Sequence, residues 1–177
     1  MVDIVDSITR SRMMSGIKGR NTKPELLIRS LLHKKGFRFR LHVKDLQGKP
    51  DIVLPKYRAI LFIHGCFWHG HENCRLFKLP NTRTEFWQNK IFRNQVNDSK
   101  AQELLLAAGW RVGTIWECAT RKSKKDPESL VEILTEWLRS NAPLLQIDEQ
   151  SILIHQEAKR TKPLDERSRE IKILEKS

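Results

Sequence analysis

The sequence predicts an α/β fold in which a mixed β-sheet is flanked by helices. Segments with strand-like apolar patterns alternate with longer segments whose apolar residues recur at helical spacing. The predicted order is helix, strand, two strands joined by a turn, helix, strand and helix, which is typical of a sheet covered by helices. The chain of 177 residues is long enough for one domain with a substantial core.

The first half of the chain predicts one helix and three strands. The helix covers residues 22–35, since Thr22 and Glu25 can form a capping box around Pro24 and the next residue is a glycine. The first strand alternates between apolar and basic side chains, as a half-exposed strand does. The other two form a hairpin, and the second of them is continuously apolar, which indicates a central position. The three strands are predicted at residues 37–42, 52–54 and 59–63.

The second half predicts a long helix at residues 84–108, which ends at Gly109, and an alternating strand at 110–116. A final helix opens at Asp126 and carries apolar residues inward as far as Leu138. Beyond it the pattern weakens. A short strand is predicted at residues 152–154, followed by a polar tail with weak helical character at 157–177.

The composition indicates a globular chain with a polyanionic partner. Hydrophobic residues make up 39% and charged residues 31%, and no apolar run is long enough for a transmembrane span or a signal peptide. We therefore expect an intracellular protein with no membrane partner. The net charge of +12 favours nucleic acid, because neutralising phosphates releases counterions. The alternative is a basic surface that is merely solvated.

The three cysteines point to a metal rather than to disulfides. Cys66, Cys74 and Cys118 are an odd number of thiols, and two of them lie beside histidines. Together with His71 they can supply the four ligands of a structural zinc site in a loop stapled by the metal. The alternative is three independent buried thiols.

The predicted hairpin carries the most reactive groups. Asp51 begins one strand and His64 ends the next, so a tight turn between the strands brings them together. A hard cation such as Mg²⁺ prefers carboxylate and carbonyl oxygens, which Asp51 and the carbonyl of Ile63 can supply. His64 and His69 have no zinc duty, so they are available for acid–base chemistry. An isolated aspartate after a turn is more often a cap.

Two further groups are candidates for nucleic-acid contacts. Phe67 and Trp68 lie in a polar loop, where they can wedge into a base stack or simply cover the zinc. Lys90 and Asn94 lie one helical turn apart and can contact base edges or phosphates, unless they are only solvent-exposed.

Several motifs together resemble a known family. Pro50-Asp51 followed by an apolar hairpin resembles the PD-(D/E)xK nuclease core, although Phe62-Ile63-His64 replaces its usual Glu-x-Lys. The motifs Phe-x-His-Gly-Cys-Phe-Trp-His, Thr-Arg-Thr-Glu-Phe-Trp and Trp-Glu-Cys resemble the very short patch repair (Vsr) DNA mismatch endonucleases. The resemblance covers roughly residues 6–140 and implies a restriction-endonuclease-like sheet in an endonuclease domain at 1–140. The basic arm at 1–21 and a partly disordered extension at 141–177, which lies outside the resemblance, are predicted from the residue pattern.

The resemblance implies a function in DNA repair. Such an enzyme nicks one strand of duplex DNA at a T:G mismatch, 5′ to the mispaired T, after deamination of 5-methylcytosine. It uses Mg²⁺, holds a structural Zn²⁺, and is expected to act as a monomer in the bacterial cytoplasm, at the nucleoid.

The resemblance also implies residue roles. Mg²⁺ is bound by Asp51 and the Ile63 carbonyl, while His69 activates water with His64, Glu25 and Asp98 in support. Zinc is held by Cys66, His71, Cys74 and Cys118. DNA is contacted by Met14, Phe67, Trp68, Trp87, Lys90 and Asn94. The chain departs from the family at position 63, where Ile replaces an expected Thr, and in a zinc loop with one extra residue and fewer histidines.

Two other functions are alternatives to a mismatch endonuclease. A restriction-type enzyme of the same superfamily cuts both strands of intact DNA and, with one active site in each small chain, needs a dimer. A zinc-containing DNA-binding module without enzymatic activity does not require Asp51, His64 and His69 to converge.

Overall fold

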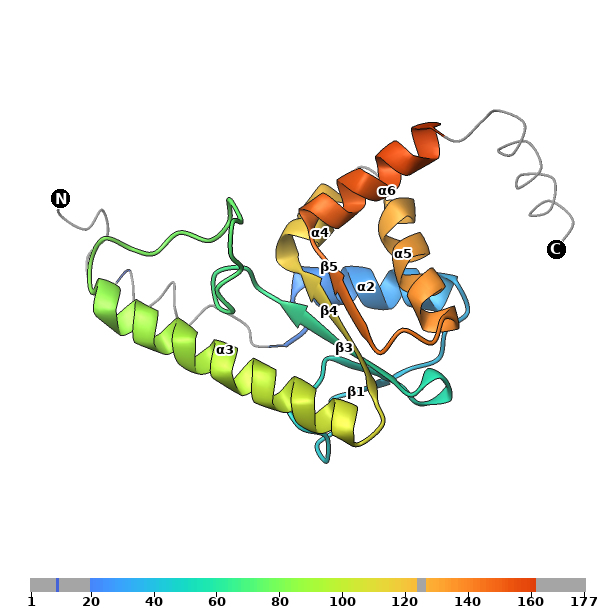
Figure 1. Ribbon diagram of the computed structural model, residues 1–177, viewed down its shortest axis with the longest axis horizontal. Helices are drawn as coiled ribbons and strands as arrows, with labels where there is room; N and C mark the ends of the chain where they lie inside the picture. Colours follow the sequence, from blue (N-terminus) through green and yellow to red (C-terminus); the bar gives the residue numbers. More distant parts are fainter. Residues whose placement is uncertain (1–8, 10–19, 124–126, 162–177) are drawn as a thin grey trace, which may run out of the picture.

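The computed structural model describes residues 9, 20–123 and 127–161. In this part of the chain, five strands and six helical segments follow the predicted alternation (Figure 1). The helical segments are α2 (Lys23–Lys34), η1 (Pro55–Tyr57), α3 (Thr84–Ala107), α4 (Glu117–Lys122), α5 (Pro127–Arg139) and α6 (Glu149–Thr161). The strands are β1 (Arg40–Leu41), β2 (Ile52–Leu54), β3 (Ala59–His64), β4 (Arg111–Trp116) and β5 (Leu144–Ile147).

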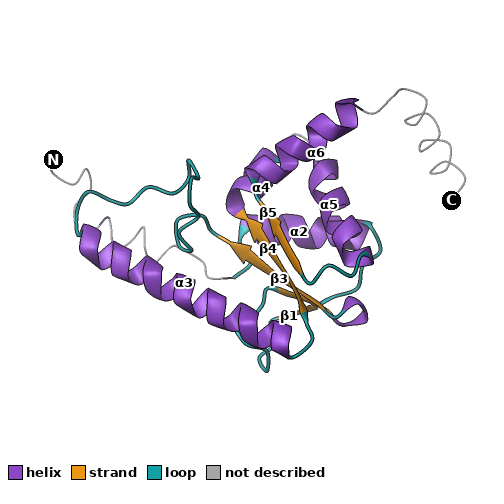
Figure 2. Cartoon of the chain, in the orientation of Figure 1, coloured by secondary structure: helices purple, strands orange, loops and turns teal. Residues whose placement is uncertain are grey.

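The five strands form one mixed sheet in the order β1-β2-β3-β4-β5 (Figure 2). The first three strands are antiparallel neighbours, and β3, β4 and β5 run parallel. Parallel neighbours need a crossover connection, which α3 supplies between β3 and β4, and α4 and α5 supply between β4 and β5. This confirms the predicted mixed sheet flanked by helices, whereas the restriction-endonuclease-like fold stays a prediction.

The helices cover the two faces of the sheet unequally. Because side chains alternate along a strand, Ile60 and Phe62 of β3 pack with Leu105 of α3 on one face. Ala59 and Leu61 point to the other face, in a larger core that α2, α5 and α6 complete. In Figure 1, α3 accordingly lies alone along one side of the sheet and the other helices lie opposite. Among the described helices, α3 is thus the one that covers this face of the sheet, whereas several helices cover the opposite face.

Local sequence signals explain several helix ends. Thr22 and Glu25 form the predicted capping box, and Gly36 adopts a positive φ of 80° directly after the first helix. The long helix and the strand that follows it also appear within one or two residues of their predicted ends. The strand predicted at residues 37–42 is shorter, since only Arg40–Leu41 pairs with β2.

The prediction for the C-terminal segment is wrong in one respect. Residues 152–154 lie in α6 and not in a strand, because Asp148 and Ser151 form a reciprocal cap that starts a helix. Ile152 then points into the core as part of a helical face. The sequence pattern predicted neither β5 nor α4. The extension predicted to begin at residue 141 thus adds a strand and a helix to the same sheet-and-helix assembly.

No helix within the described residues has the length and apolar character needed to cross a membrane. Met14 and most of the predicted N-terminal arm lie outside the described residues.

Candidate active site and metal centre

The predicted hairpin brings Asp51 to the end of β3. The Ile63 N–H donates to Asp51 Oδ2 at 2.7 Å, and the Asp51 N–H donates to the Leu61 carbonyl at 3.2 Å. Carbonyls of alternate residues in a strand point to the same edge, so the Ile63 carbonyl faces the same edge as the Leu61 carbonyl. The Asp51 carboxylate and the Ile63 carbonyl therefore lie at the same edge of β3, directly before the first residue of β2.

The Asp51 carboxyl is held in an environment that disfavours its charge. Burial raises its pKa from the ordinary value of 3.8 to about 6, and the nearby Glu25 carboxylate acts in the same direction. The hydrogen bond from Ile63 and the positive charge of Arg29 oppose this shift without cancelling it. Within the described residues Asp51 has no ion-pair partner, so a cation beside it would stabilise its ionised form.

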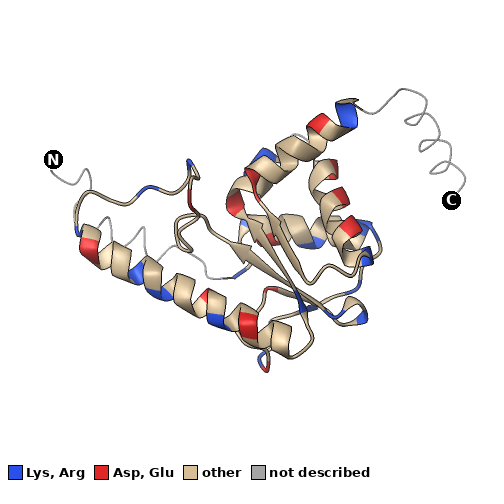
Figure 3. Ribbon diagram, viewed as in Figure 1, with Lys and Arg blue, Asp and Glu red and all other residues tan. Residues whose placement is uncertain are grey.

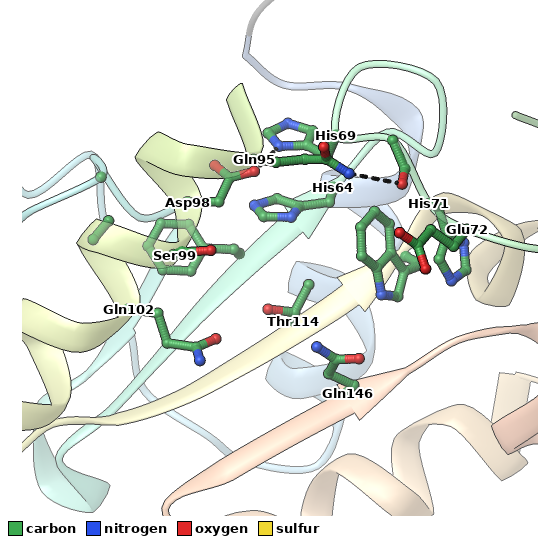
Figure 4. Close-up of a pocket in the computed structure, with 15 residues that line it drawn as sticks. His64, His69, His71, Glu72, Gln95, Asp98, Ser99, Gln102, Thr114 and Gln146 are labelled. Carbon is green, nitrogen blue, oxygen red and sulfur yellow. Dashed lines mark hydrogen bonds and ion pairs between the residues drawn. The ribbon is translucent and has the colours of Figure 1, made fainter. Parts of the chain in front are cut away.

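His64, His69 and Asp98 converge beside this edge. The two imidazole rings stack with centroids 3.8 Å apart and an interplanar angle of 7°. His69 Nδ1 lies 2.6 Å from Asp98 Oδ2, and among the described residues its Nε2 has no hydrogen-bond partner (Figure 4). A carboxylate on one imidazole nitrogen fixes the ring and increases the basicity of the other nitrogen.

His64 is uncharged at neutral pH. Burial lowers its pKa to about 4, and the neighbouring His69 acts in the same direction, whereas Asp98 opposes the shift. The residue can therefore supply a neutral imidazole nitrogen beside His69 without placing a second positive charge there. A cavity of about 490 Å³ opens next to these rings, between α3 and the strands β3, β4 and β5.

The loop that carries His69 is fixed by α3. Asn94 Nδ2 donates to the Trp68 carbonyl at 2.8 Å, and Gln95 Nε2 donates to the Gly70 carbonyl at 3.2 Å. Gly70 has a φ of +61°, and a Cβ there would lie 2.7 Å from the Ile91 side chain. Only glycine allows this close approach, so the loop backbone at Gly70 packs directly against side chains of α3.

The four predicted zinc ligands form one cluster. The ligand atoms of Cys66, His71, Cys74 and Cys118 all lie within 4.8 Å of one another. His71 Nδ1 lies 3.5 Å from the Cys66 sulfur and 3.6 Å from the Cys118 sulfur. In a tetrahedral zinc site with ordinary Zn–S and Zn–N bond lengths, two such donor atoms are about 3.6 Å apart. These residues therefore fit a metal ion with tetrahedral Cys₃His ligation.

The same cluster favours a thiolate. The pKa of Cys118 is lowered to about 6, chiefly by a hydrogen bond from the Cys66 thiol, although burial opposes the shift. A backbone hydrogen bond from Glu149 at the start of α6 also lowers it. Conversely, its interaction with Cys118 raises the pKa of Cys66, so the pair resembles one thiol bonded to one thiolate. Thiolates are the form in which cysteines bind zinc.

Three predicted DNA-contacting rings form a single aromatic cluster beside the metal loop. Phe67 lies 5.2 Å from Trp68 and 5.4 Å from Trp87, and the two tryptophan rings are 5.9 Å apart. All three are half-buried, so each combines packing with an accessible surface. The three predicted wedge residues thus pack against one another.

The remaining predicted residues differ in what they contact. Lys90 is exposed on α3, whereas Asn94 already bonds the Trp68 carbonyl and therefore holds the loop. Glu25 is buried, caps α2 and pairs with Arg29 at 2.8 Å. Arg29, whose charge lowers the pKa of Asp51, was not among the site residues predicted from the sequence. The local sequence signal for Arg29 was its position four residues after Glu25, which allows an ion pair along one face of a helix.

Basic side chains accompany this side of the molecule. Figure 3 shows Lys and Arg on the loop that precedes α3 and along α3 itself, interspersed with acidic residues. Together with the net charge of +12, this arrangement is compatible with a polyanion lying against the aromatic cluster.

Comparison with known proteins gives consistent matches. A family model described as DNA mismatch endonuclease Vsr matches residues 2–75. The DNA mismatch endonuclease Vsr of Escherichia coli (strain K12) is 45% identical over 153 residues, which are 86% of this chain and 97% of that protein. A stretch of 153 residues is longer than residues 1–140, so this likeness extends into the C-terminal extension.

Two nicking enzymes are similar as well. Type II nicking enzyme V.XorIIP of Xanthomonas oryzae pv. oryzae is 48% identical over 118 residues, 67% of this chain and 86% of that protein. Type II nicking enzyme V.NmeAIP of Neisseria meningitidis serogroup A is 41% identical over 136 residues, 77% of this chain and 96% of that protein.

The raised pKa of Asp51 predicts a stabilising substitution. Asp51→Asn keeps an oxygen for the Ile63 N–H but removes the buried charge, so it should increase the free energy of unfolding at pH 8 by about 1–3 kcal/mol. Because the wild-type penalty grows as pH rises from 3.8 to about 6, the difference should vanish below about pH 4.

Urea unfolding without added divalent cations measures this difference. Asp45→Asn, at an exposed aspartate, is the matched control and should change stability little at either pH. An advantage of Asp51→Asn that is equally large at pH 4 and pH 8 would contradict the prediction.

Proposed function

Because the chain belongs to the Vsr family of DNA mismatch endonucleases, we propose that it nicks one strand of duplex DNA at T:G mismatches. The chain is therefore an endonuclease, and the proposed cut lies 5′ to the mispaired T. The proposed substrate arises when 5-methylcytosine deaminates. The observation that carries the proposal is that Asp51, bonded to the Ile63 N–H near the end of β3, lies within electrostatic reach of His69, which clusters with His64 and Asp98.

Asp51 and the Ile63 carbonyl suit a hard divalent cation. Both are oxygen donors at one edge of the sheet, and burial raises the pKa of Asp51 to about 6, so a cation beside it would stabilise the ionised carboxylate. When bound there, Mg²⁺ supplies charge stabilisation to the scissile phosphate. The departure from Thr to Ile at position 63 leaves this donor set intact, since a backbone carbonyl does not depend on the side chain.

His69 is the proposed general base. Its Nδ1 faces the Asp98 carboxylate, so its Nε2 can take a proton from a water molecule that attacks the phosphate. His64, neutral because its pKa is lowered, lies against the same ring and can orient that water. Glu25 acts from a distance, through its electrostatic effect on Asp51 and through its bond to Arg29.

The aromatic cluster is the proposed mismatch reader. A mispaired step unstacks at lower cost than a paired one, so rings that insert between bases favour a mismatch. Phe67, Trp68 and Trp87 form one supported surface for such insertion. Lys90 is available for DNA, and Asn94 serves by positioning Trp68. Met14, which lies outside the described residues, is proposed to insert from the opposite groove.

The Cys₃His cluster is the proposed structural zinc site, because a closed set of four protein ligands leaves no position for a substrate. We further propose that the enzyme acts as a monomer on DNA in the bacterial cytoplasm, since one chain carries one set of catalytic groups and one strand is cut. The metal then holds the loop that carries both His69 and Trp68.

Labelled duplexes with a T:G pair in varied sequence contexts test the proposal against T:A controls. With Mg²⁺ the protein should nick only the T strand of the mismatched duplex. Asp51→Ala should abolish nicking at any Mg²⁺ concentration and still bind the duplex, whereas Asp45→Ala should behave as wild type. Cleavage of both strands of intact DNA would indicate a restriction-type enzyme. Binding without any cleavage would indicate a DNA-binding module.

His69→Ala should lower the single-turnover nicking rate by about 10²–10⁴-fold, the usual contribution of a general base. Affinity for the T:G duplex should stay nearly unchanged, because the residue is proposed to act on water. His33→Ala, at an exposed histidine of α2, is the matched control. A His69→Ala enzyme with the wild-type rate would remove His69 from the mechanism.

Trp68→Ala should weaken binding to a T:G duplex by about 1–3 kcal/mol, the range measured for base–aromatic stacking. Binding to a T:A duplex should change less, because a paired step resists insertion. Phe92→Ala removes an exposed ring elsewhere on α3 and serves as the control in equilibrium binding measurements. Equal losses on both duplexes would show that Trp68 contributes packing instead of recognition.

A further inference from the structure

The loop from Cys66 to Cys74, which carries three of the four clustered ligands, lies beside a carboxylate that is distant in the sequence. The segment between β5 and α6 carries Asp148, whose Oδ2 lies 3.9 Å from His71 Nε2. The other nitrogen of the same ring, Nδ1, is the one that faces the Cys66 and Cys118 sulfurs. The two nitrogens of His71 are thus divided between the cysteine cluster and a carboxylate.

This division has a chemical consequence. A histidine that binds a metal through Nδ1 must carry its remaining proton on Nε2, where it becomes a hydrogen-bond donor. Metal-binding histidines commonly give that proton to a carboxylate, which fixes the tautomer and the ring orientation. At 3.9 Å the pair is beyond a direct hydrogen bond, and a small closing movement would bring the two atoms within hydrogen-bond distance.

The surroundings hold both partners in place. The Trp116 ring stacks on the His71 ring with centroids 4.0 Å apart and an interplanar angle of 4°. Asp148 Oδ1 accepts hydrogen bonds from the Ser151 N–H at 2.7 Å and from the Ser151 hydroxyl at 2.8 Å. With Oδ1 engaged at the start of α6, it is Oδ2 that faces His71.

A second contact ties the same segment to the cluster. The residue after Asp148 is Glu149, the first residue of α6. The Glu149 side chain pairs with Arg75, which directly follows the Cys74 ligand, at 3.0 Å. The start of α6 therefore lies beside both His71 and the residue that follows Cys74.

We infer that Asp148 is a positioning residue of the metal centre, which accepts the Nε2 proton of His71 and so presents Nδ1 to the metal. This inference rests on the zinc site proposed above. It gives the C-terminal strand and helix a role in the metal centre, because the chain reaches Asp148 only through β5.

A simpler role for Asp148 is to cap α6, and one substitution separates the two roles. Asp148→Asn keeps an oxygen for the Ser151 N–H, and asparagine caps helices as well as aspartate does. Its amide NH₂ then faces the His71 N–H, so two donors oppose each other. Ser151→Ala is the matched control, because it weakens the cap without touching His71.

Zinc affinity of the full-length chain, measured by competition with a chelator of known affinity, tests the inference. The wild type should bind about one zinc ion, Asp148→Asn should bind it about 10–100-fold more weakly, and Ser151→Ala should stay within about threefold of wild type. Circular dichroism checks that each variant is folded. Wild-type affinity in Asp148→Asn, or an equal loss in Ser151→Ala, would overturn the inference.

A second measurement needs no variant. In the zinc-loaded wild type, nitrogen NMR should show His71 bound to metal through Nδ1 and protonated on Nε2. Ligation through Nε2 would overturn the role of Asp148 and leave the zinc site intact. A wild-type chain that binds no zinc would instead overturn the zinc site itself, so the two failures are distinguishable.

Discussion

The pairing of β3 with its two neighbours brings together Asp51, Ile63 and the two buried cysteines, Cys66 and Cys118. On one side, the antiparallel register that pairs Leu61 with Ile52 brings Asp51 alongside Ile63. On the other side, the parallel register pairs His64 with Trp116. Cys66 and Cys118 each follow their paired residue by two positions, so the same register brings the two thiols together. A shift of one residue would reverse every side chain of β3 and separate both sites.

The α3 helix converts this edge of the sheet into a defined site. Its side chains reach the loop after β3 at three successive points, through Asn94, Gln95 and Asp98. The first two bond backbone carbonyls and the third bonds His69, so one rigid helix fixes both the aromatic residues and the imidazole. A long helix with only three buried residues is costly to stabilise by packing alone, and these polar contacts explain part of its placement. The positions of His69 and Trp68 in the loop after β3 thus depend on a helix that is largely exposed.

Local patterns predicted the elements that carry their own signals, and they failed where a signal depends on distant partners. The capping box of Thr22 and Glu25 and the continuous apolar run of β3 are readable from a few adjacent residues. The strand β5 is short and half-exposed, and it is a strand only because β4 lies beside it. Residues 152–154 look strand-like in isolation, yet Asp148 and Ser151 cap a helix over them. Asp148 meets His71 only after the sheet is complete, so no spacing in the sequence could have joined them.

The Cys₃His cluster and the edge of the sheet at Asp51 differ in how their charges are balanced. In the cluster, the interaction between the two thiols lowers the pKa of Cys118 and raises the pKa of Cys66, which favours one thiolate. At the edge beside Asp51, burial instead raises the pKa of that carboxyl and lowers the pKa of His64. Both shifts favour neutral forms, so the folded protein carries a desolvation cost at this edge, which a cation and a phosphate can offset together. Without a cation the edge at Asp51 is therefore electrostatically unfavourable, which is the trade-off between stability and activity expected if this edge is the proposed active site.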